Sequence, residues 1–212
     1  MQRYKFPRTT HFPFSPGRSA DDLVDEPSFD GEVVVTVKMD GGCTTIYSDG
    51  YCHARSIDSG YHESRSYVSR LAVEVGLALP AGWRLCGENL YARHSIHYKN
   101  LLDYFYAFAI FDDGPNGGMC LSWDDFISVT RGLPRGNLYL PEPVFIGPYD
   151  AKYIRNLAEL LDSHEGIVVR PTASFHYTDY SSVVRKYVRE NHVVSSDHWM
   201  YDKLTKNELA RG

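Results

Sequence analysis

The sequence lacks a long apolar run, an apolar leader and any closely spaced pair of cysteines. No stretch of its 212 residues approaches the roughly 20 apolar residues of a membrane-spanning helix. Residues 1–7 have no apolar core of the kind found in a signal peptide. The four cysteines are scattered and match neither a disulfide framework nor a zinc motif. These absences predict a cytoplasmic protein that makes no contact with a membrane.

A surplus of basic residues is also missing. The formal net charge is −5 at pH 7, which argues against a protein that coats nucleic acid through a broad basic surface. A local basic groove stays compatible with this balance. The hydrophobic content of 43% and charged content of 23% are ordinary for a globular protein, so the chain can bury a sizeable core.

Alternating and helically spaced apolar residues predict a mixed α+β chain. We expect strands near 32–38, 43–48, 51–54, 83–88, 104–111, 166–170 and 183–188, and helices near 62–77, 123–131 and 151–162. Ser48-Asp49-Gly50 is predicted to turn a hairpin, and Ser122 and Asp150 are predicted to cap the last two helices.

Composition divides the chain into three parts. Residues 1–30 are rich in Pro, Ser and Asp and predict an irregular N-terminal arm, in which 21–26 form a solvated acidic loop. Residues 31–190 are expected to form the main domain. Residues 191–212 are expected to be a short C-terminal tail.

The most informative stretch is Lys38-Met39-Asp40-Gly41, which ends the apolar, β-branched run 33–37. A lysine at the end of a buried strand is unusual, because burying an ammonium group is costly unless it is paired. Desolvation and nearby cations lower the pKa of a lysine, and a neutral amine is a nucleophile. Asp40 shares the strand face of Lys38 if the extended conformation continues, and Gly41 lets backbone approach a ligand closely. Four such residues also occur by chance in turns, so the interpretation depends on partners downstream.

Downstream segments supply such partners in order. They are a strand that ends in Glu88, an aromatic strand over 104–111, Glu165-Gly166 entering a β-branched strand, and a strand that carries Lys186. This ordered set resembles the covalent nucleotidyltransferase superfamily of polynucleotide ligases and mRNA capping enzymes. Within it, the chain is most similar to ATP-dependent RNA ligases of the phage double-strand-sealing type. The resemblance implies an α+β fold, an ATP-grasp-like ligase adenylation domain with antiparallel sheets flanked by helices.

The resemblance also implies the chemistry of the site. Lys38 would be the nucleophile that takes AMP from ATP as a covalent phosphoramidate and expels pyrophosphate. Lys186 would bind the phosphate and lower the pKa of Lys38 by like-charge proximity. Glu165 would bind the metal, with Mg²⁺ expected and Mn²⁺ as the alternative.

Other motif residues would bind the nucleotide. Glu88 would lie near the sugar, Arg55 would hold a phosphate, and Phe108 would stack on the purine. Because Phe108 alternates with Tyr106 and Ile110, core packing is the competing interpretation for that strand face. The complete set of predicted nucleotide-binding residues is Val37, Asp40, Gly41, Arg55, Glu88, Phe108, Glu165 and Lys186.

Simpler roles compete with some of these assignments. Glu88 could cap a turn with Asn89, and Arg55 could be a surface residue after a hairpin. His94 and His97 could share a helix face, but the sequence shows no third ligand that would make them a metal site.

The chain departs from the family pattern at three positions. Cys43 stands where DNA ligases carry an arginine, which favours the RNA-ligase branch, and Ala109 stands where many relatives carry aspartate. The second lysine of the last motif is absent, so the second cation is either missing or replaced by Arg185 or Arg189. If the strand continues, these two arginines share one face and Lys186 takes the other.

We therefore predict an ATP-dependent RNA ligase that seals RNA ends or a nicked RNA duplex. It would act in three steps, through a covalent lysyl-AMP and an RNA-adenylate, and join a 5′-phosphate to a 3′-hydroxyl. The residues after Lys186 are too few for an OB domain, so an accessory protein or the substrate itself would replace that domain. The alternatives are a GTP-dependent capping-type guanylyltransferase and a non-catalytic nucleotide-binding or RNA-binding module.

Overall fold

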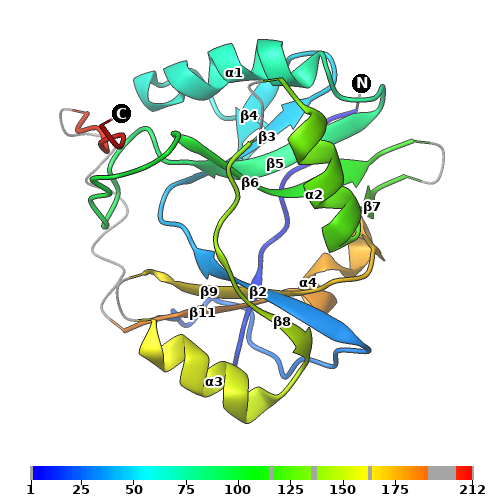
Figure 1. Ribbon diagram of the computed structural model, residues 1–212, viewed down its shortest axis with the longest axis vertical. Coiled ribbons are helices and arrows are strands. Elements are labelled where there is room, and N and C mark those ends of the chain that lie inside the picture. The colour runs from blue at the N-terminus through cyan, green and yellow to red at the C-terminus, as the bar shows by residue number, and fades with distance from the viewer. Residues whose placement is uncertain (1, 115–116, 135–137, 162–163, 191–203, 212) are drawn as a thin grey trace.

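A computed structural model describes residues 2–114, 117–134, 138–161, 164–190 and 204–211. Within these ranges the chain forms two β-sheets that lie one above the other (Figure 1). The strands are β1 (Thr10–His11), β2 (Glu32–Lys38), β3 (Gly42–Tyr47), β4 (Cys52–Ala54), β5 (Trp83–Asn89), β6 (Phe105–Asp112), β7 (Met119–Cys120), β8 (Pro143–Pro148), β9 (Gly166–Pro171), β10 (Phe175–His176) and β11 (Arg185–Val188). The helices are α1 (Ser66–Gly76), α2 (Trp123–Gly132), α3 (Ala151–Leu160) and α4 (Tyr180–Val183).

Both sheets are predominantly antiparallel. The five-stranded sheet has the order β1-β11-β9-β2-β8, and the six-stranded sheet has the order β10-β7-β6-β5-β3-β4. The pairing of β1 with β11 is the parallel exception. Helix α1 lies over the outer face of the six-stranded sheet and α3 lies against the outer face of the five-stranded sheet (Figure 1). The mixed α+β class expected from the sequence is confirmed.

Strand β2 positions the motif lysine through its alternation. Val33 and Val35 pack in the cluster that includes Ile154 of α3, on the outer side of the five-stranded sheet. Thr36 and Lys38 point the other way and line a pocket between the sheets. Strand β2 lies between β9 and β8, and residues on both of its faces are buried. This burial explains why its sequence is almost continuously apolar.

Helices begin where the sequence predicts caps. The Ser122 side chain accepts a hydrogen bond from the Asp125 backbone N–H, and the Asp150 side chain accepts one from Tyr153. Helix α1 buries positions at helical spacing against the six-stranded sheet. These are Val68, Leu71, Ala72 and Val75. Residues 63–65 form a 3₁₀ turn directly before α1, so the α-helix begins at Ser66 and not at the predicted residue 62.

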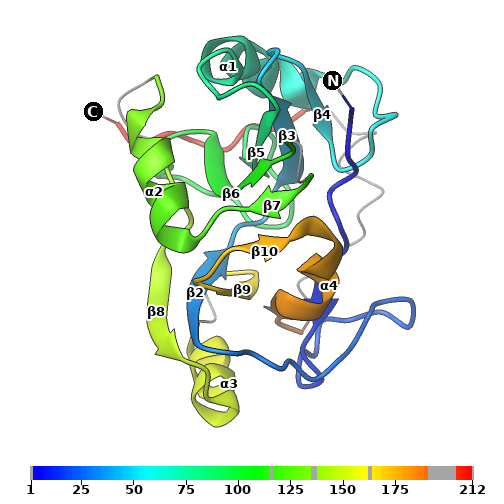
Figure 2. The same ribbon diagram turned by 90° about the vertical axis from the view of Figure 1, so that its right-hand side faces the viewer.

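The N-terminal arm runs from one sheet to the other (Figure 2). The Arg3 guanidinium pairs with Asp49 in the β3–β4 turn, 2.7 Å away. Farther along, Thr10 lies opposite Arg185, so the arm supplies the edge strand of the five-stranded sheet. The arm therefore ties the two sheets together. No helix in the described ranges is long and apolar enough to cross a membrane.

Candidate active site

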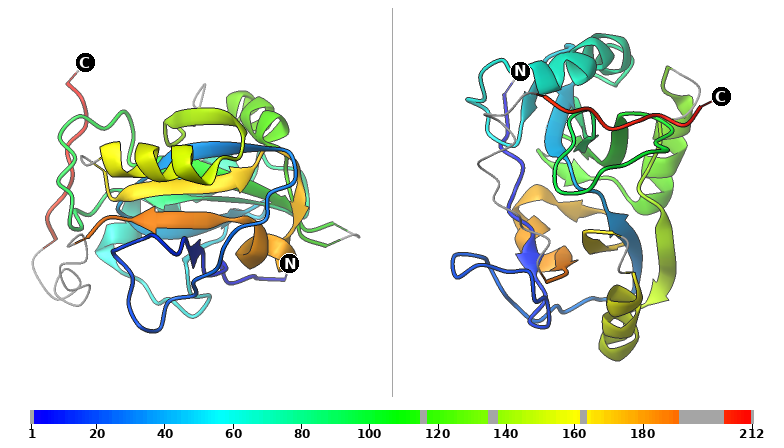
Figure 3. Two further views of the ribbon diagram at one scale, coloured as in Figure 1. Left: turned by 90° about the horizontal axis from the view of Figure 1, so that it is seen from below. Right: turned by 90° about the vertical axis from the view of Figure 1, so that its left-hand side faces the viewer.

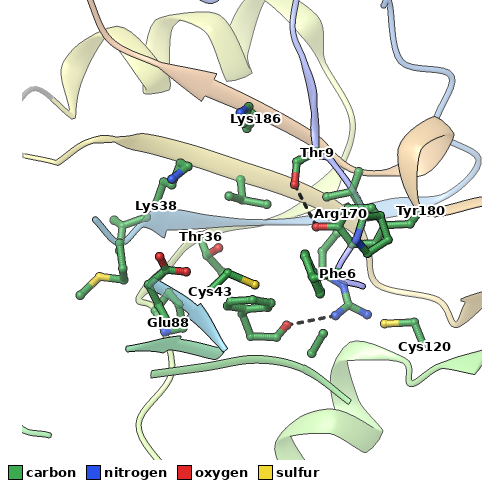
Figure 4. A pocket seen from close by; sticks show the side chains of 18 of the residues that line it. Phe6, Thr9, Thr36, Lys38, Cys43, Glu88, Cys120, Arg170, Tyr180 and Lys186 are labelled. Atoms are coloured by element: carbon green, nitrogen blue, oxygen red, sulfur yellow. Dashed lines mark hydrogen bonds between the residues drawn. The ribbon is translucent and has the colours of Figure 1, made fainter. Parts of the chain in front are cut away.

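A cavity of about 320 Å³ opens between the two sheets (Figure 4). Its size lies at the lower end of the range for small-molecule sites, which begins at roughly 300 Å³. Seven of the predicted nucleotide-binding and catalytic residues line it: Val37, Lys38, Gly41, Arg55, Glu88, Phe108 and Lys186. Lys38, Glu88 and Lys186 lie toward one side of the cavity, whereas Cys120 and Tyr180 lie toward the other. The pocket thus has a charged end and a mainly apolar end.

Lys38 forms an ion pair with Glu165 across neighbouring strands. The Lys38 Nζ lies 2.5 Å from the Glu165 Oε2. Burial lowers the pKa of Lys38, but the charges of Glu165 and Glu88 outweigh it, so its pKa is raised above the ordinary value. The expected depression of the Lys38 pKa is therefore not met in this arrangement, because the neighbouring carboxylates outweigh the effects that lower it.

Like-charge proximity acts on the other lysine. Burial, and then the charge of Lys38, lower the pKa of Lys186. Lys186 lies in β11, opposite Val168 of β9. Arg185 points away from the cavity, and its guanidinium donates to the Ser181 carbonyl and to Asp25. Among the described residues that line the pocket, neither Arg185 nor Arg189 is present, so Arg185 does not replace a second lysine there.

Glu165 owes its place to the glycine that follows it. Gly166 has φ of +156°, and a Cβ at this position would collide with the Tyr187 carbonyl oxygen of β11. Glycine therefore lets β9 and β11 approach closely, with Glu165 held at the start of β9. The predicted metal ligand thus lies beside the predicted nucleophile, although it is not among the described residues that line the cavity.

Asp40 does not continue the strand face of Lys38. Strand β2 ends at Lys38, and the Asp40 carboxylate accepts a hydrogen bond from the Ile96 backbone N–H at 2.7 Å. The Asp40 backbone N–H donates to the Tyr98 hydroxyl at 2.9 Å. Asp40 would share the strand face of Lys38 only if the strand continued, and that condition is not met. Its assignment as a nucleotide-binding residue stays a prediction.

Gly41, directly before β3, and Glu88 of β5 both line the pocket. A Cβ on Gly41 would lie 2.5 Å from the Asn89 carbonyl oxygen, so only glycine permits this approach. Burial raises the pKa of Glu88 to about 8, and the charge of Lys38 opposes that shift. Cys43 lies opposite Glu88 in the β3–β5 register and also lines the pocket. Burial raises the pKa of the Cys43 thiol well above its usual value, so it stays protonated.

A β-bulge turns Phe108 into the pocket. Cys86 pairs with Ala109 and Gly87 pairs with Ala107, so Phe108 is the extra residue between them. Ile110 instead packs in the cluster beneath α1. Regular alternation would place Phe108 and Ile110 on one face of the strand. The bulge instead puts them on opposite faces.

Several pocket residues carry no recognisable signal in the sequence. Phe6, Pro7 and Thr9 of the arm line the cavity, and the Phe6 ring packs edge-on against Phe108 with centroids 5.3 Å apart. Arg170 bridges the sheets, because its guanidinium donates to the Leu121 carbonyl at 2.7 Å and to the Phe108 carbonyl at 3.4 Å. The arm has no periodicity that could have revealed these contacts.

The two candidate histidines do not share a helix face. His94 and His97 lie in an irregular segment rather than on a helix, and His97 pairs with Glu208 at 3.1 Å. Within the described ranges, no group of three His, Cys, Asp or Glu side chains is arranged to hold a metal ion.

The raised pKa of Glu88 predicts a pH-dependent stability. A folded-state pKa of about 8 against an ordinary value of 4.5 contributes stability that is fully present below 4.5 and lost as the pH rises through about 8. Glu88→Gln removes this loss, so the variant should nearly match the unsubstituted protein at about pH 5 and exceed it by on the order of 5 kcal/mol at about pH 9. Urea unfolding at both pH values measures the difference.

The exposed Glu32, at the start of β2, provides a matched control. Glu32→Gln should leave the pH dependence of unfolding unchanged. Equal pH dependence in Glu88→Gln and the unsubstituted protein would show that Glu88 is ionised throughout.

A family model described as RNA ligase matches residues 31–188. No curated protein sequence matches the chain. The structure of a Naegleria gruberi RNA ligase with pyrophosphate has a TM-score of 0.55 at 17% identity, covering 89% of this chain and 61% of that one. A variant of the same ligase with ATP and Mn has a TM-score of 0.53 at 18% identity, covering 76% and 50%.

An archaeal ATP-dependent RNA ligase has a TM-score of 0.51 at 17% identity, covering 76% of this chain and 43% of that one. The chain therefore spans between 43% and 61% of the length of these three structures. At such identities the likeness shows the fold, and it confirms the predicted nucleotidyltransferase fold class.

Proposed function

The chain belongs to the RNA ligase family, and we propose that it is an ATP-dependent RNA ligase that joins a 5′-phosphate to a 3′-hydroxyl. The observation that carries this proposal is the Lys38–Glu165 ion pair at the charged end of a pocket of about 320 Å³. A second lysine, Lys186, lines the same pocket from the neighbouring part of the sheet.

The reaction would proceed in three balanced steps. The Lys38 amine attacks the α-phosphorus of ATP, so that an N–P bond forms and the bond to the β-phosphate breaks, releasing pyrophosphate. A 5′-phosphate oxygen of RNA then attacks the same phosphorus and releases the Lys38 amine. A 3′-hydroxyl finally attacks the RNA 5′-phosphate and expels AMP.

Lys38 must lose a proton before it attacks. In the structure, the ion pair with Glu165 retains that proton, because it opposes the pKa-lowering effect of burial. Separation of Lys38 from Glu165 would leave burial dominant and favour the neutral amine. Lys186 and Arg55 line the same pocket and would stabilise negative charge that develops on the phosphates.

The carboxylate oxygens near Lys38 suit a hard divalent cation. Mg²⁺ is usually held by one or two carboxylates together with substrate phosphate oxygens, so a preformed cluster of three protein ligands is not required. Glu165 would hold it, and Glu88 faces the same charged end of the pocket. When bound, Mg²⁺ or Mn²⁺ would neutralise phosphate charge.

The purine would extend from the charged end toward the apolar end. Phe108 lines the same pocket and would offer a ring face for stacking. The Phe6 ring contacts Phe108 edge-on and would hold that ring in place. Contacts to the RNA beyond the pocket would come from the substrate's own structure or from an accessory protein.

A labelling and chase experiment tests the proposal. Incubation with Mg²⁺ and α-labelled ATP is expected to give a covalent adduct, and GTP is expected to give at least about tenfold less, because unpaired polar groups penalise the wrong base. The isolated adduct should then seal a nick whose 3′-hydroxyl strand ends in ribonucleotides. It should seal an all-DNA nick poorly, since the 2′-hydroxyl separates RNA from DNA.

Each part of this experiment tests a different alternative. Equal labelling by ATP and GTP would favour capping-type chemistry, and absence of any adduct would favour a non-catalytic binding module. Equal sealing of ribose-ended and deoxyribose-ended nicks would contradict the RNA-ligase assignment but retain lysine nucleotidyl transfer. High salt should lower the rate of the sealing step more than the rate of labelling. Binding of RNA phosphates releases counterions, so the affinity for RNA falls as the salt concentration rises.

A further inference from the structure

The C-terminal segment 204–211 lies alongside the loop between β5 and β6 (Figure 3, right). Ala92 is bridged to Lys206, and Leu101 to Leu209. The Ala210 N–H also donates to the Leu101 carbonyl at 2.8 Å. This segment lies outside residues 31–188, which the family model matches. The contacts therefore belong to a part of the chain for which family membership assigns no role.

Asn207 is the centre of this contact. It is only 1% exposed, and its side-chain amide donates to the Leu90 carbonyl at 2.8 Å and to the Ala92 carbonyl at 3.3 Å. Its side-chain oxygen accepts a hydrogen bond from the Tyr98 N–H at 2.9 Å. The Tyr104 hydroxyl donates to the Asn207 carbonyl at 3.1 Å. One buried side chain thus fixes both ends of the segment 90–98.

The same segment holds the turn after the candidate nucleophile. The Tyr98 hydroxyl accepts the Asp40 N–H at 2.9 Å, and the Asp40 carboxylate accepts the Ile96 N–H at 2.7 Å. Gly41 packs directly against the Asn89 carbonyl and the Leu90 side chain. Continuous polar contacts therefore run from Asn207 through Tyr98 to Asp40, two residues after Lys38.

We propose that Asn207 is a positioning residue for Lys38, which it orients through Tyr98 and the Asp40 turn. This proposal rests on the proposed function, because it assigns Asn207 a part in lysyl-AMP formation. Loss of the amide would leave buried backbone groups of the 90–98 segment unpaired. The segment would then relax, and the Asp40 turn would lose its support. A small displacement of a reacting group lowers the rate even when binding is retained.

Single-turnover kinetics of lysyl-AMP formation test the proposal on the full chain. The rate constant at saturating ATP is measured for Asn207→Ala, Tyr98→Phe and the double variant. Each single variant should lower this rate constant by roughly tenfold. The ATP concentration for half-maximal rate should change by less than about threefold, since the pocket residues are unaltered. The fraction of protein labelled at the end point should stay unchanged, which a general loss of folded protein would not produce.

Tyr98→Phe keeps the ring and removes only the acceptor of the Asp40 N–H, so it serves if Asn207→Ala folds poorly. The double variant should be no slower than the slower single variant, because both substitutions interrupt one route. Asp150→Ala is the matched control. It removes the side-chain cap of α3, on the outer face of the five-stranded sheet, and should lower the urea midpoint of unfolding without altering the rate constant.

The possible outcomes are distinguishable. Unchanged rate constants in Asn207→Ala and Tyr98→Phe would overturn the positioning role, as would a lower labelled fraction at an unchanged rate constant. Fully additive losses in the double variant would overturn the route through Tyr98. If the unsubstituted protein forms no adduct with ATP, the proposed function itself fails.

Discussion

Lys38→Ala is expected to abolish covalent labelling by ATP while the fold is retained. Lys38 and Lys186 are the lysines among the described residues that line the pocket, and Lys38 is the one that β2 presents beside Glu165. Without its amine, no phosphoramidate can form at this position. Labelled ATP with Mg²⁺, followed by denaturing electrophoresis, measures the adduct, and circular dichroism measures the fold.

Lys38→Arg is the matched control for charge. A guanidinium can keep the ion pair with Glu165, but it stays protonated and cannot attack phosphorus. It should therefore fold normally and still form no adduct. An acid-labile AMP adduct in either variant would refute the assignment of Lys38 as nucleophile.

Lys186→Ala should reduce the rate of lysyl-AMP formation by roughly 10²–10³-fold, the usual effect of removing one preorganised group that stabilises transition-state charge. The neighbouring Arg185 should behave in the opposite way. Its guanidinium is buried and hydrogen-bonds Asp25 and backbone carbonyls, away from the pocket. Arg185→Met should therefore destabilise the protein by on the order of 2 kcal/mol and leave the rate constant of the folded fraction unchanged.

Rate constants and urea unfolding of the two variants, measured side by side, separate these roles. Lys186→Ala should unfold near the urea concentration of the unsubstituted protein. A large rate defect in Arg185→Met with normal stability would restore Arg185 as the second cation of the last motif. A normal rate in Lys186→Ala would remove Lys186 from the phosphate site.

Local sequence pattern predicted the elements that bear the motifs. The β-branched run before Lys38 is central and buried on both faces, so its strand character follows from composition alone. Ser122 and Asp150 cap their helices as expected, because a cap depends on residues three positions apart. The ordered motifs also identified the family, which the match over residues 31–188 confirms.

The details that escaped prediction depend on contacts between distant segments. Phe108 enters the pocket through a bulge, which depends on the partner strand and not on the alternation of its own strand. Phe6 has no periodic neighbours, yet it packs in the cluster between the sheets. The Lys38 pKa depends on Glu165 and Glu88, whose distances the sequence does not contain. Sequence pattern therefore locates motif residues better than it defines their surroundings.

The boundaries of the three predicted parts stay a prediction. The family match begins at residue 31 and ends at 188, close to the expected limits of the main domain. Nevertheless, the arm supplies β1 to the five-stranded sheet, and 204–211 bonds to the loop after β5. Both flanking parts share contacts with the main domain in the described residues.

The pairing of the arm with β11 has a consequence for the order of folding. Thr10 lies opposite Arg185, so this edge closes only after Arg185 has left the ribosome. Such distant pairing slows folding, because a long loop must close before the contact forms. Before β11 is synthesised, the pocket therefore lacks Val184 and Lys186. A nascent chain whose β11 is still unsynthesised would thus present Lys38 without Lys186, the second lysine of the pocket.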